Sequence, residues 1–253
     1  MSISLETKRT NFRKLHEEGT LILTNPWDIG GLRRLEKLGA KAIATTSAGF
    51  SWHLGREDFE AAKEEVLAHL TQLCAATDLP VNADFQSGFA DDPADLAENV
   101  KQAIETGIAG LSIEDRTGDQ LYSPELSVER IRACRQAIDE TGQDVLLVAR
   151  CEGLLTGTAD MDEVITRLKA YADAGADVLF APGVMDKEHI KSMVDAVAPK
   201  PVNVLLLTAD MEIGALASLG VRRFSTGFAL AQSAWVGFEV AAASVLQQGH
   251  LPS

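Results

Sequence analysis

The sequence predicts an α/β fold, a single (β/α)₈ barrel over residues 1–253. Eight short apolar runs alternate with longer stretches of helical periodicity. Several of the predicted helices end in glycine just before the next strand, at Gly39, Gly107, Gly175 and Gly220, where glycine supplies the left-handed cap. Repeated strand–helix units pair in parallel through right-handed crossovers, and eight units without an obvious linker favour a closed barrel.

The predicted elements follow in chain order. A polar N-terminal helix precedes the strands, and a C-terminal helix at 229–248 follows them. The predicted strands are 21–23, 42–45, 80–84, 110–114, 145–149, 178–181, 202–206 and 223–225. The clearest helical periodicity lies in 30–39, 95–107, 127–142 and 161–175. A doubly wound sheet is the alternative, but the turn at 25–31 after the first strand lacks a glycine-rich phosphate motif.

Composition narrows the classes of partner and compartment. The net charge of −14, without basic clusters, argues against nucleic acid. The start of the chain does not resemble a signal peptide, and no apolar run has the length expected of a membrane span. Cys74, Cys134 and Cys151 are widely spaced, which fits buried thiols in a reducing compartment. We therefore expect a cytoplasmic protein without membrane contact.

Acidic and polar residues follow the predicted strands, where barrel active sites lie. They are Asp28, Thr46–Ser47, Asp84, Glu114–Asp115, Arg150 with Glu152, Asn203 and Thr226. Carboxylates that converge on one mouth repel one another unless a cation lies between them. Oxygen ligands of this kind suit Mg²⁺ or Mn²⁺.

Two of these residues allow a structural alternative. Asp28 is equally well placed to cap the next helix. Arg150 follows a very apolar strand and needs an anionic partner. One alternative is an acid of the protein, Glu152 or another acid of the site. The other is a substrate carboxylate held by two hydrogen bonds.

Four short motifs resemble the isocitrate lyase/phosphoenolpyruvate mutase superfamily, from about Leu21 to the last helix. Leu-Gly-Arg-Glu-Asp at 54–58 is similar to the family's LGxPD turn, and Pro-Val-Asn-Ala-Asp at 80–84 to its PVxxD strand. Ser-Ile-Glu-Asp at 112–115 and Ala-Arg-Cys-Glu at 149–152 also match. Each motif is weak alone, but the four occur in the family's order.

The resemblance implies a barrel enzyme that acts on a small α-oxo or α-hydroxy carboxylate through a metal-stabilised enolate. It implies Mg²⁺ or Mn²⁺ on Asp84, with Asp58 and Glu114 helping directly or through water. Arg150, Glu114 and Asp58 are the expected catalytic residues. The expected substrate contacts are Thr46, Ser47, Ala48, Arg150 and Asn203. In this family the last helix often packs on a neighbouring subunit. The apolar stripe with Trp235 and Phe238 on the C-terminal helix therefore predicts a homo-oligomer, a dimer or tetramer. Packing of this stripe on the barrel itself is the alternative.

Two departures from the family pattern limit the reaction. The family's DxDxGxG segment has Gln86 in place of its second aspartate, so Gln86 is expected to reach the metal through water. The lyases' KxCGH loop, whose cysteine acts as an acid, is replaced at 115–124 by a segment without Cys, His or Lys. Cleavage of isocitrate or methylisocitrate is therefore not expected.

Three functions remain open. Oxaloacetate decarboxylation is the best match, because it needs mainly a metal that polarises the keto group and a source of a proton. Phosphoenolpyruvate or phosphonopyruvate mutase or hydrolase chemistry is the first alternative, favoured by the ARxE pattern at Arg150 and Glu152. A keto-acid-binding barrel without turnover is the second. His53 is interpreted as an ordinary helix residue and Cys151 as a packing residue.

Overall fold

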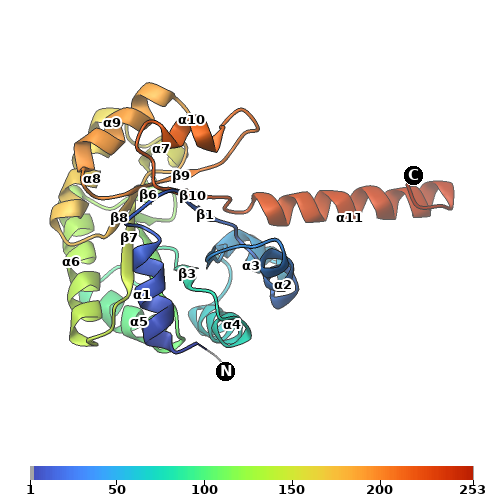
Figure 1. Ribbon diagram of the computed structural model, residues 1–253, viewed down its shortest axis with the longest axis horizontal. Coiled ribbons are helices and arrows are strands. Elements are labelled where there is room, and N and C mark those ends of the chain that lie inside the picture. Colours follow the sequence, from blue (N-terminus) through green and yellow to red (C-terminus); the bar gives the residue numbers. More distant parts are fainter. Residues whose placement is uncertain (1–2, 253) are drawn as a thin grey trace.

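The computed structural model describes residues 3–252 and contains a closed barrel of eight parallel strands surrounded by helices (Figure 1). Around the barrel the strands follow the order β1-β10-β9-β8-β7-β4-β3-β2, and a parallel bridge from Thr24 to Ile43 joins β1 to β2. The strands are β1 (Leu21–Leu23), β2 (Ile43–Ala44), β3 (Val81–Asp84), β4 (Gly110–Glu114), β7 (Leu146–Arg150), β8 (Val178–Phe180), β9 (Val202–Leu205) and β10 (Arg223–Ser225). The predicted barrel and all eight strands are confirmed, with ends that shift by one residue or, for β2, are trimmed at both ends.

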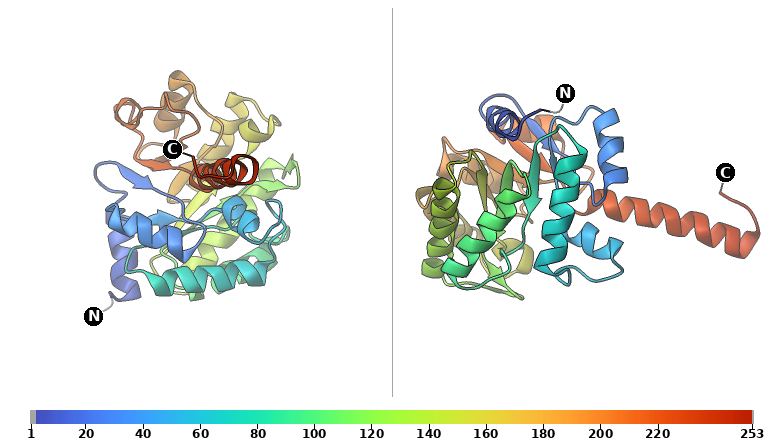
Figure 2. Two further views of the ribbon diagram at one scale, coloured as in Figure 1. Left: turned by 90° about the vertical axis from the view of Figure 1, so that its right-hand side faces the viewer. Right: turned by 90° about the horizontal axis from the view of Figure 1, so that it is seen from below.

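Helices precede, connect and follow the strands, and all but the last, α11, lie against the barrel (Figure 2). They are α1 (Leu5–Lys14), α2 (Ile29–Lys37), α3 (Ser47–His53), α4 (Lys63–Ala76), α5 (Pro93–Glu105), α6 (Pro124–Glu140), α7 (Gly153–Thr156), α8 (Met161–Asp173), α9 (Lys187–Val197), α10 (Ile213–Ala217) and α11 (Ala229–Gln248). The segment after β4 forms a small hairpin of β5 (Arg116–Thr117) and β6 (Gln120–Leu121). The large apolar core lies between the strands and the helices.

The first helix closes the amino-terminal end of the barrel. Phe12 of α1 is fully buried in a cluster with Leu21, Leu23 and Leu146 from the strands. Gly110 makes room there, because a Cβ at this position would lie 2.8 Å from the Phe12 ring and 2.8 Å from the Asn82 Oδ1 atom. The Phe12 side chain therefore fills the barrel at the amino-terminal ends of its strands.

Asn25, which follows β1, is hydrogen-bonded to the segments that follow β2 and β10. Its Nδ2 atom donates to the carbonyl of Thr45, 2.7 Å away, across the β1–β2 junction. Its Oδ1 atom accepts from the backbone N–H groups of Thr226 and Gly227, each at 3.0 Å. The buried side-chain amide of Asn25 thus links β1, β2 and the turn that leads into α11.

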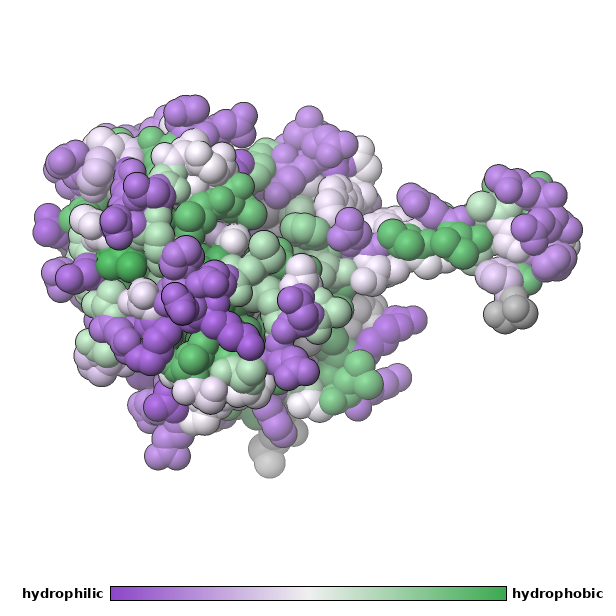
Figure 3. Space-filling view, turned by 90° about the horizontal axis from the view of Figure 1, so that it is seen from above, coloured by the Kyte–Doolittle hydropathy of each residue, from purple (hydrophilic) through white to green (hydrophobic). Residues whose placement is uncertain are grey.

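The last helix, α11, projects from the barrel instead of packing on it (Figures 1 and 2). Large apolar side chains lie exposed along it, including Phe238 with 64% exposure and Leu246 with 85%, and Figure 3 shows apolar surface on the projection. The alternative of ordinary barrel packing is therefore wrong.

Within residues 3–252, α11 is also the one helix long and apolar enough to span a membrane. The expectation that no segment reaches that length is thus not met. One such helix is weak support for a membrane span, and α11 carries Glu239 near its centre.

Candidate active site

The carboxyl ends of the strands surround a cavity of about 190 Å³, which suits only a small ligand. Seven of the nine predicted site residues line this cavity: Thr46, Ser47, Ala48, Asp58, Asp84, Arg150 and Asn203. Glu114 and Gln86 are buried behind its wall. The strand-end pattern therefore brings most of the expected residues into one place.

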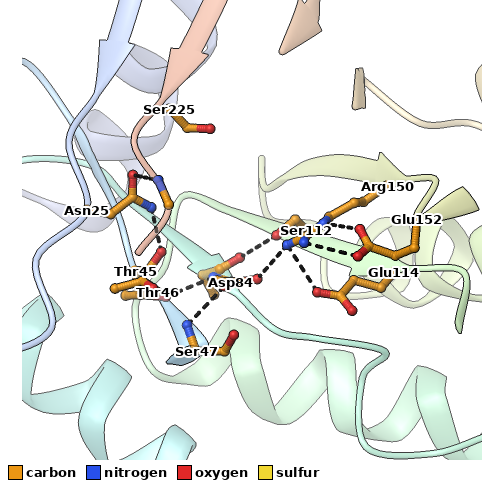
Figure 4. A network of polar contacts seen from close by, with 12 residues as sticks. Asn25, Thr45, Thr46, Ser47, Asp84, Ser112, Glu114, Arg150, Glu152 and Ser225 are labelled. Atoms are coloured by element: carbon orange, nitrogen blue, oxygen red, sulfur yellow. Dashed lines mark hydrogen bonds and ion pairs between the residues drawn. The ribbon is translucent and has the colours of Figure 1, made fainter. Parts of the chain in front are cut away.

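Arg150 is the centre of a buried ionic cluster, which Figure 4 shows. Its Nη1 atom lies 3.0 Å from Glu114 Oε1 and 3.5 Å from Asp84 Oδ1, while its Nε and Nη2 atoms donate to the carboxylate of Glu152. Burial alone would lower the pKa of Arg150, but the surrounding carboxylates raise it above its ordinary value. In this structure the anionic partners of Arg150 are therefore acids of the site itself.

Three acids of the site, Glu114, Glu152 and Asp58, have pKa values raised above the ordinary values of carboxyl groups. Burial raises the pKa of Glu114 well above its usual range, and the neighbouring carboxylates of Glu152 and Asp84 add to the effect. Burial likewise raises the pKa of Glu152. For Asp58, burial and then the charge of Asp84 raise the pKa. These shifts come first from burial, and neighbouring carboxylates add to them.

Asp84 is held by the loop that begins α3. Its Oδ2 atom accepts from the Ser47 backbone N–H at 3.0 Å, and its own N–H donates to Thr45 Oγ1 at 2.8 Å. Thr46 caps the helix by accepting from the Gly49 N–H at 3.3 Å. The carboxylate of Asp84 is thereby aimed at the cavity beside Arg150 (Figure 4).

A divalent cation fits the chemistry of this donor set. Four carboxylates, those of Asp58, Asp84, Glu114 and Glu152, surround the guanidinium groups of Arg116 and Arg150. Two polar atoms beside them, Glu114 Oε2 and Gln86 Nε2, are buried without a hydrogen-bond partner. Among the described residues no three Asp, Glu, His or Cys side chains form a metal cage, so direct binding by three carboxylates is not seen. Mg²⁺ often binds one or two carboxylates and keeps several waters, which agrees with this arrangement.

Gln86 lies in a constrained loop directly after β3. Its φ of +52° falls in the left-handed region that non-glycine residues rarely adopt, and its backbone carbonyl accepts from the Glu114 N–H at 2.9 Å. Its side chain does not line the cavity, and its expected contact with a metal through water stays a prediction.

Arg116 is a site residue that the sequence analysis missed. It lines the cavity, its Nε atom lies 3.7 Å from Glu114 Oε2, and its guanidinium lies 4.2 Å from the ring centroid of Phe59. The cation–π contact joins the β5–β6 hairpin to the loop that carries Asp58. The signal in the sequence is an arginine directly after the Glu114–Asp115 pair, in the segment that lacks Cys, His and Lys.

Three other strand-end or nearby residues have structural roles. Asp28 caps α2 by accepting from the Gly31 N–H, so the capping alternative is confirmed. Asp115 turns away from the cavity and accepts from the Tyr171 hydroxyl at 2.6 Å and from the Glu152 N–H at 2.9 Å. Cys151 is fully buried, as predicted for a packing residue.

Comparison with known proteins identifies relatives over most of the chain. Residues 12–246 match the phosphoenolpyruvate phosphomutase family. An uncharacterised protein of Mycobacterium tuberculosis is 33% identical over 219 residues, which cover 86% of this chain and 81% of that protein. The 2-methylisocitrate lyase of Escherichia coli K12 is 30% identical, over 71% of this chain and 62% of the enzyme. The crystal structure of a candidate lyase/mutase from Burkholderia cenocepacia J2315 aligns with a TM-score of 0.94 at 42% identity, over 98% of this chain and 91% of that one.

Proposed function

Because the chain belongs to the phosphoenolpyruvate phosphomutase family, within the isocitrate lyase/phosphoenolpyruvate mutase superfamily of enzymes, we propose that it is a metal-dependent lyase. The proposed reaction is the decarboxylation of a small α-oxo dicarboxylate, with oxaloacetate as the first substrate to test. The observation that carries this proposal is the surplus of buried carboxylate around Asp84 and Arg150, in a cavity of about 190 Å³. Such a site suits Mg²⁺ or Mn²⁺ and a substrate of a few carbon atoms.

Each residue of the cavity has a distinct proposed task. Asp84 would hold the metal directly, with Asp58 at the cavity wall and Glu114 behind it acting through water. When bound, the metal supplies a Lewis acid that stabilises negative charge on the keto oxygen. The three acids hold the guanidinium of Arg150 in one orientation. Arg150 therefore loses little conformational entropy when substrate binds.

Decarboxylation matches the proton donors that the cavity offers. The bond to the departing carboxylate breaks, its electron pair passes toward the keto oxygen, carbon dioxide leaves and one proton adds to the carbon. Among the described residues that line the cavity there is no Cys, His or Lys to supply that proton. Asp58 lines the cavity with a raised pKa and is the proposed proton carrier, with solvent as its source.

Phosphonopyruvate chemistry is the second candidate, favoured by one observation. Arg116 and Arg150 place two guanidinium groups at the same cavity, and guanidinium groups bind phosphonate oxygens as well as carboxylates. In this reading Arg116 would contact the phosphonate group from the β5–β6 hairpin.

The proposed assembly rests on the exposed face of α11, and the proposed location on the three buried free cysteines Cys74, Cys134 and Cys151. The exposed apolar stripe of α11 suits a second copy of the chain, and we propose a homo-oligomer in the cytoplasm. Sedimentation velocity of the intact protein measures this directly. A protein that is monomeric at micromolar concentration would contradict it.

The reaction is tested with purified protein in Mg²⁺, in Mn²⁺ and in a chelator. Oxaloacetate, phosphonopyruvate and methylisocitrate are offered separately, while pyruvate, inorganic phosphate and succinate are measured. We expect metal-dependent pyruvate from oxaloacetate, and no succinate from methylisocitrate. Succinate release would refute the argument from the missing lid cysteine. Binding of oxaloacetate without turnover of any substrate would show a binding protein instead.

A pair of variants tests the metal site itself. Asp84→Asn keeps the size of the side chain but removes its charge, and we expect metal-dependent activity to fall about 100-fold or more. Asp95→Asn is the matched control, because Asp95 is an exposed residue in the first turn of α5. Full activity of Asp84→Asn would exclude the proposed metal site.

A further inference from the structure

Arg223 adds a third guanidinium group to the active-site cavity and places it at the bottom, away from Arg116 and Arg150. It is the first residue of β10, whereas Arg150 is the last residue of β7, so Arg223 lies deeper along the barrel. It is 3% exposed and lines the same cavity as Arg150 and Asp84. Arg223 therefore forms the floor of the cavity whose mouth holds the ionic cluster.

The charge of Arg223 has no counter-charge in the structure. Its Nε atom donates to Asn203 Oδ1 at 3.0 Å, and its Nη1 atom lies 3.4 Å from His16 Nε2. No Asp or Glu among residues 3–252 forms an ion pair with it, whereas Arg150 contacts three acids. Burial lowers the pKa of Arg223 to about 9, and no carboxylate opposes that effect.

The neighbours of Arg223 orient its guanidinium but cannot neutralise it. The Nδ1 atom of His16 must donate to the Phe12 carbonyl, 2.8 Å away, because a carbonyl only accepts. His16 Nε2 is therefore the lone-pair nitrogen and accepts from Arg223. Burial, and then the charge of Arg223, lower the pKa of His16 to about 3, so the ring is neutral. An unpaired buried cation is strongly unfavourable, and an anion that enters the cavity would relieve it.

We propose that Arg223 binds one carboxylate of the substrate at the floor of the cavity, so that the site selects dicarboxylates over monocarboxylates. This inference rests on the proposed function, since it assigns a subsite within that cavity. Ser225 assists: its Oγ atom accepts from Asn203 Nδ2 at 3.0 Å, which leaves its O–H free to donate into the cavity. Figure 4 shows Ser225 apart from the Arg150 cluster, on the strand that carries Arg223.

The position of the floor also fixes the orientation of the substrate. A guanidinium stabilises the charged carboxylate and opposes its loss as carbon dioxide, so the carboxylate on Arg223 is the one that is retained. The departing carboxylate then faces the mouth, where Asp58 and solvent can deliver the proton. The keto oxygen lies between them, at the level of Asp84.

Calorimetric titration with two unreactive hydroxy acids tests the subsite. Malate and lactate differ by one carboxylate, and each enantiomer is titrated in the presence of Mg²⁺. We expect at least one malate enantiomer to bind the unmodified protein tenfold or more tightly than lactate. Arg223→Met should reduce this ratio below threefold, and Arg223→Lys should restore part of it. Arg222→Met, which removes an exposed arginine next to it, should leave the ratio unchanged.

Each other outcome overturns a defined part of the inference. Equal affinity of the unmodified protein for malate and lactate would refute dicarboxylate selection, even if Arg223→Met failed to fold. An unchanged ratio in folded Arg223→Met would show that the arginine is only structural. Inorganic phosphate, offered alone, tests for a separate anion: Arg223-dependent thermal stabilisation that malate does not displace would refute a substrate subsite. If activity is absent but the malate preference depends on Arg223, the proposed reaction fails and the subsite stands.

Discussion

Replacement of Arg130 by methionine should destabilise the loop that follows β3 and weaken metal binding with it. Arg130 lies on α6 and is 1% exposed. Its Nη1 atom donates to the carbonyls of Ala90 at 2.5 Å and Asp91 at 2.6 Å, and its Nη2 atom donates to the carbonyl of Ser87. One side chain thus holds the loop that starts with the constrained Gln86.

The size of the effect follows from these contacts. A hydrogen bond from a charged group contributes about 1.5–3 kcal/mol, and a buried carbonyl left without a donor costs about 1–3 kcal/mol. Because the three bonds share one guanidinium and water can reach part of the loop, we expect a total loss of about 4 kcal/mol. Unfolding entropy for a chain of this length converts that loss to a fall in Tm of about 8 °C.

Thermal and denaturant unfolding of the metal-free protein measure the loss, and calorimetry measures Mg²⁺ affinity. Arg132→Met is the matched control, because Arg132 is an exposed arginine on the same helix. We expect the control to change stability by less than about 0.5 kcal/mol. The reasoning is refuted if Arg130→Met and Arg132→Met unfold alike, or if Arg130→Met loses stability but keeps full Mg²⁺ affinity.

Three further predictions concern protons, packing and assembly. The raised pKa of Glu114 means that the folded metal-free protein binds a proton more tightly than the unfolded chain, so its stability falls as pH rises through that pKa. The increase in Tm caused by Mg²⁺ should therefore grow as the pH is raised; an increase independent of pH would count against a cation at this cluster. Gly88→Ala should lower stability by about 2–4 kcal/mol in urea unfolding, because Gly88 has a φ of +80° and a Cβ there would overlap Leu96; a change below about 0.5 kcal/mol would contradict this. Phe238→Glu should shift the sedimentation coefficient toward that of a monomer without lowering Tm by more than about 2 °C; an unchanged oligomer would exclude this face as the interface.

The barrel and much of its mouth could be predicted from the sequence because both depend on local pattern. Strand runs bounded by glycine caps place the eight strands within one residue or so of their observed ends. Residues at strand ends converge by topology alone, which brings Asp84 and Arg150 together although 66 positions separate them. The depth of each side chain is not a local property, so the burial of Glu114 behind the wall could not be predicted.

Contacts between distant segments explain the features that were missed. Arg116 belongs to the site because its guanidinium stacks on Phe59 from another loop, and neither residue is unusual in its own segment. Arg223 follows an ordinary strand pattern, and its missing counter-charge becomes visible only when the interior of the barrel is assembled. The projection of α11 could not be predicted either, because an apolar stripe in the sequence does not indicate which surface covers it.

The amide of Asn25 connects two parts of the molecule that otherwise lie far apart. Asn25 lines the cavity and also holds the backbone of Thr226 and Gly227 at the root of α11. That helix of 20 residues is about 30 Å long, so each degree of rotation at its root moves its tip by about 0.5 Å. A small rotation at Asn25, beside the cavity, would therefore become a measurable displacement at the far end of α11.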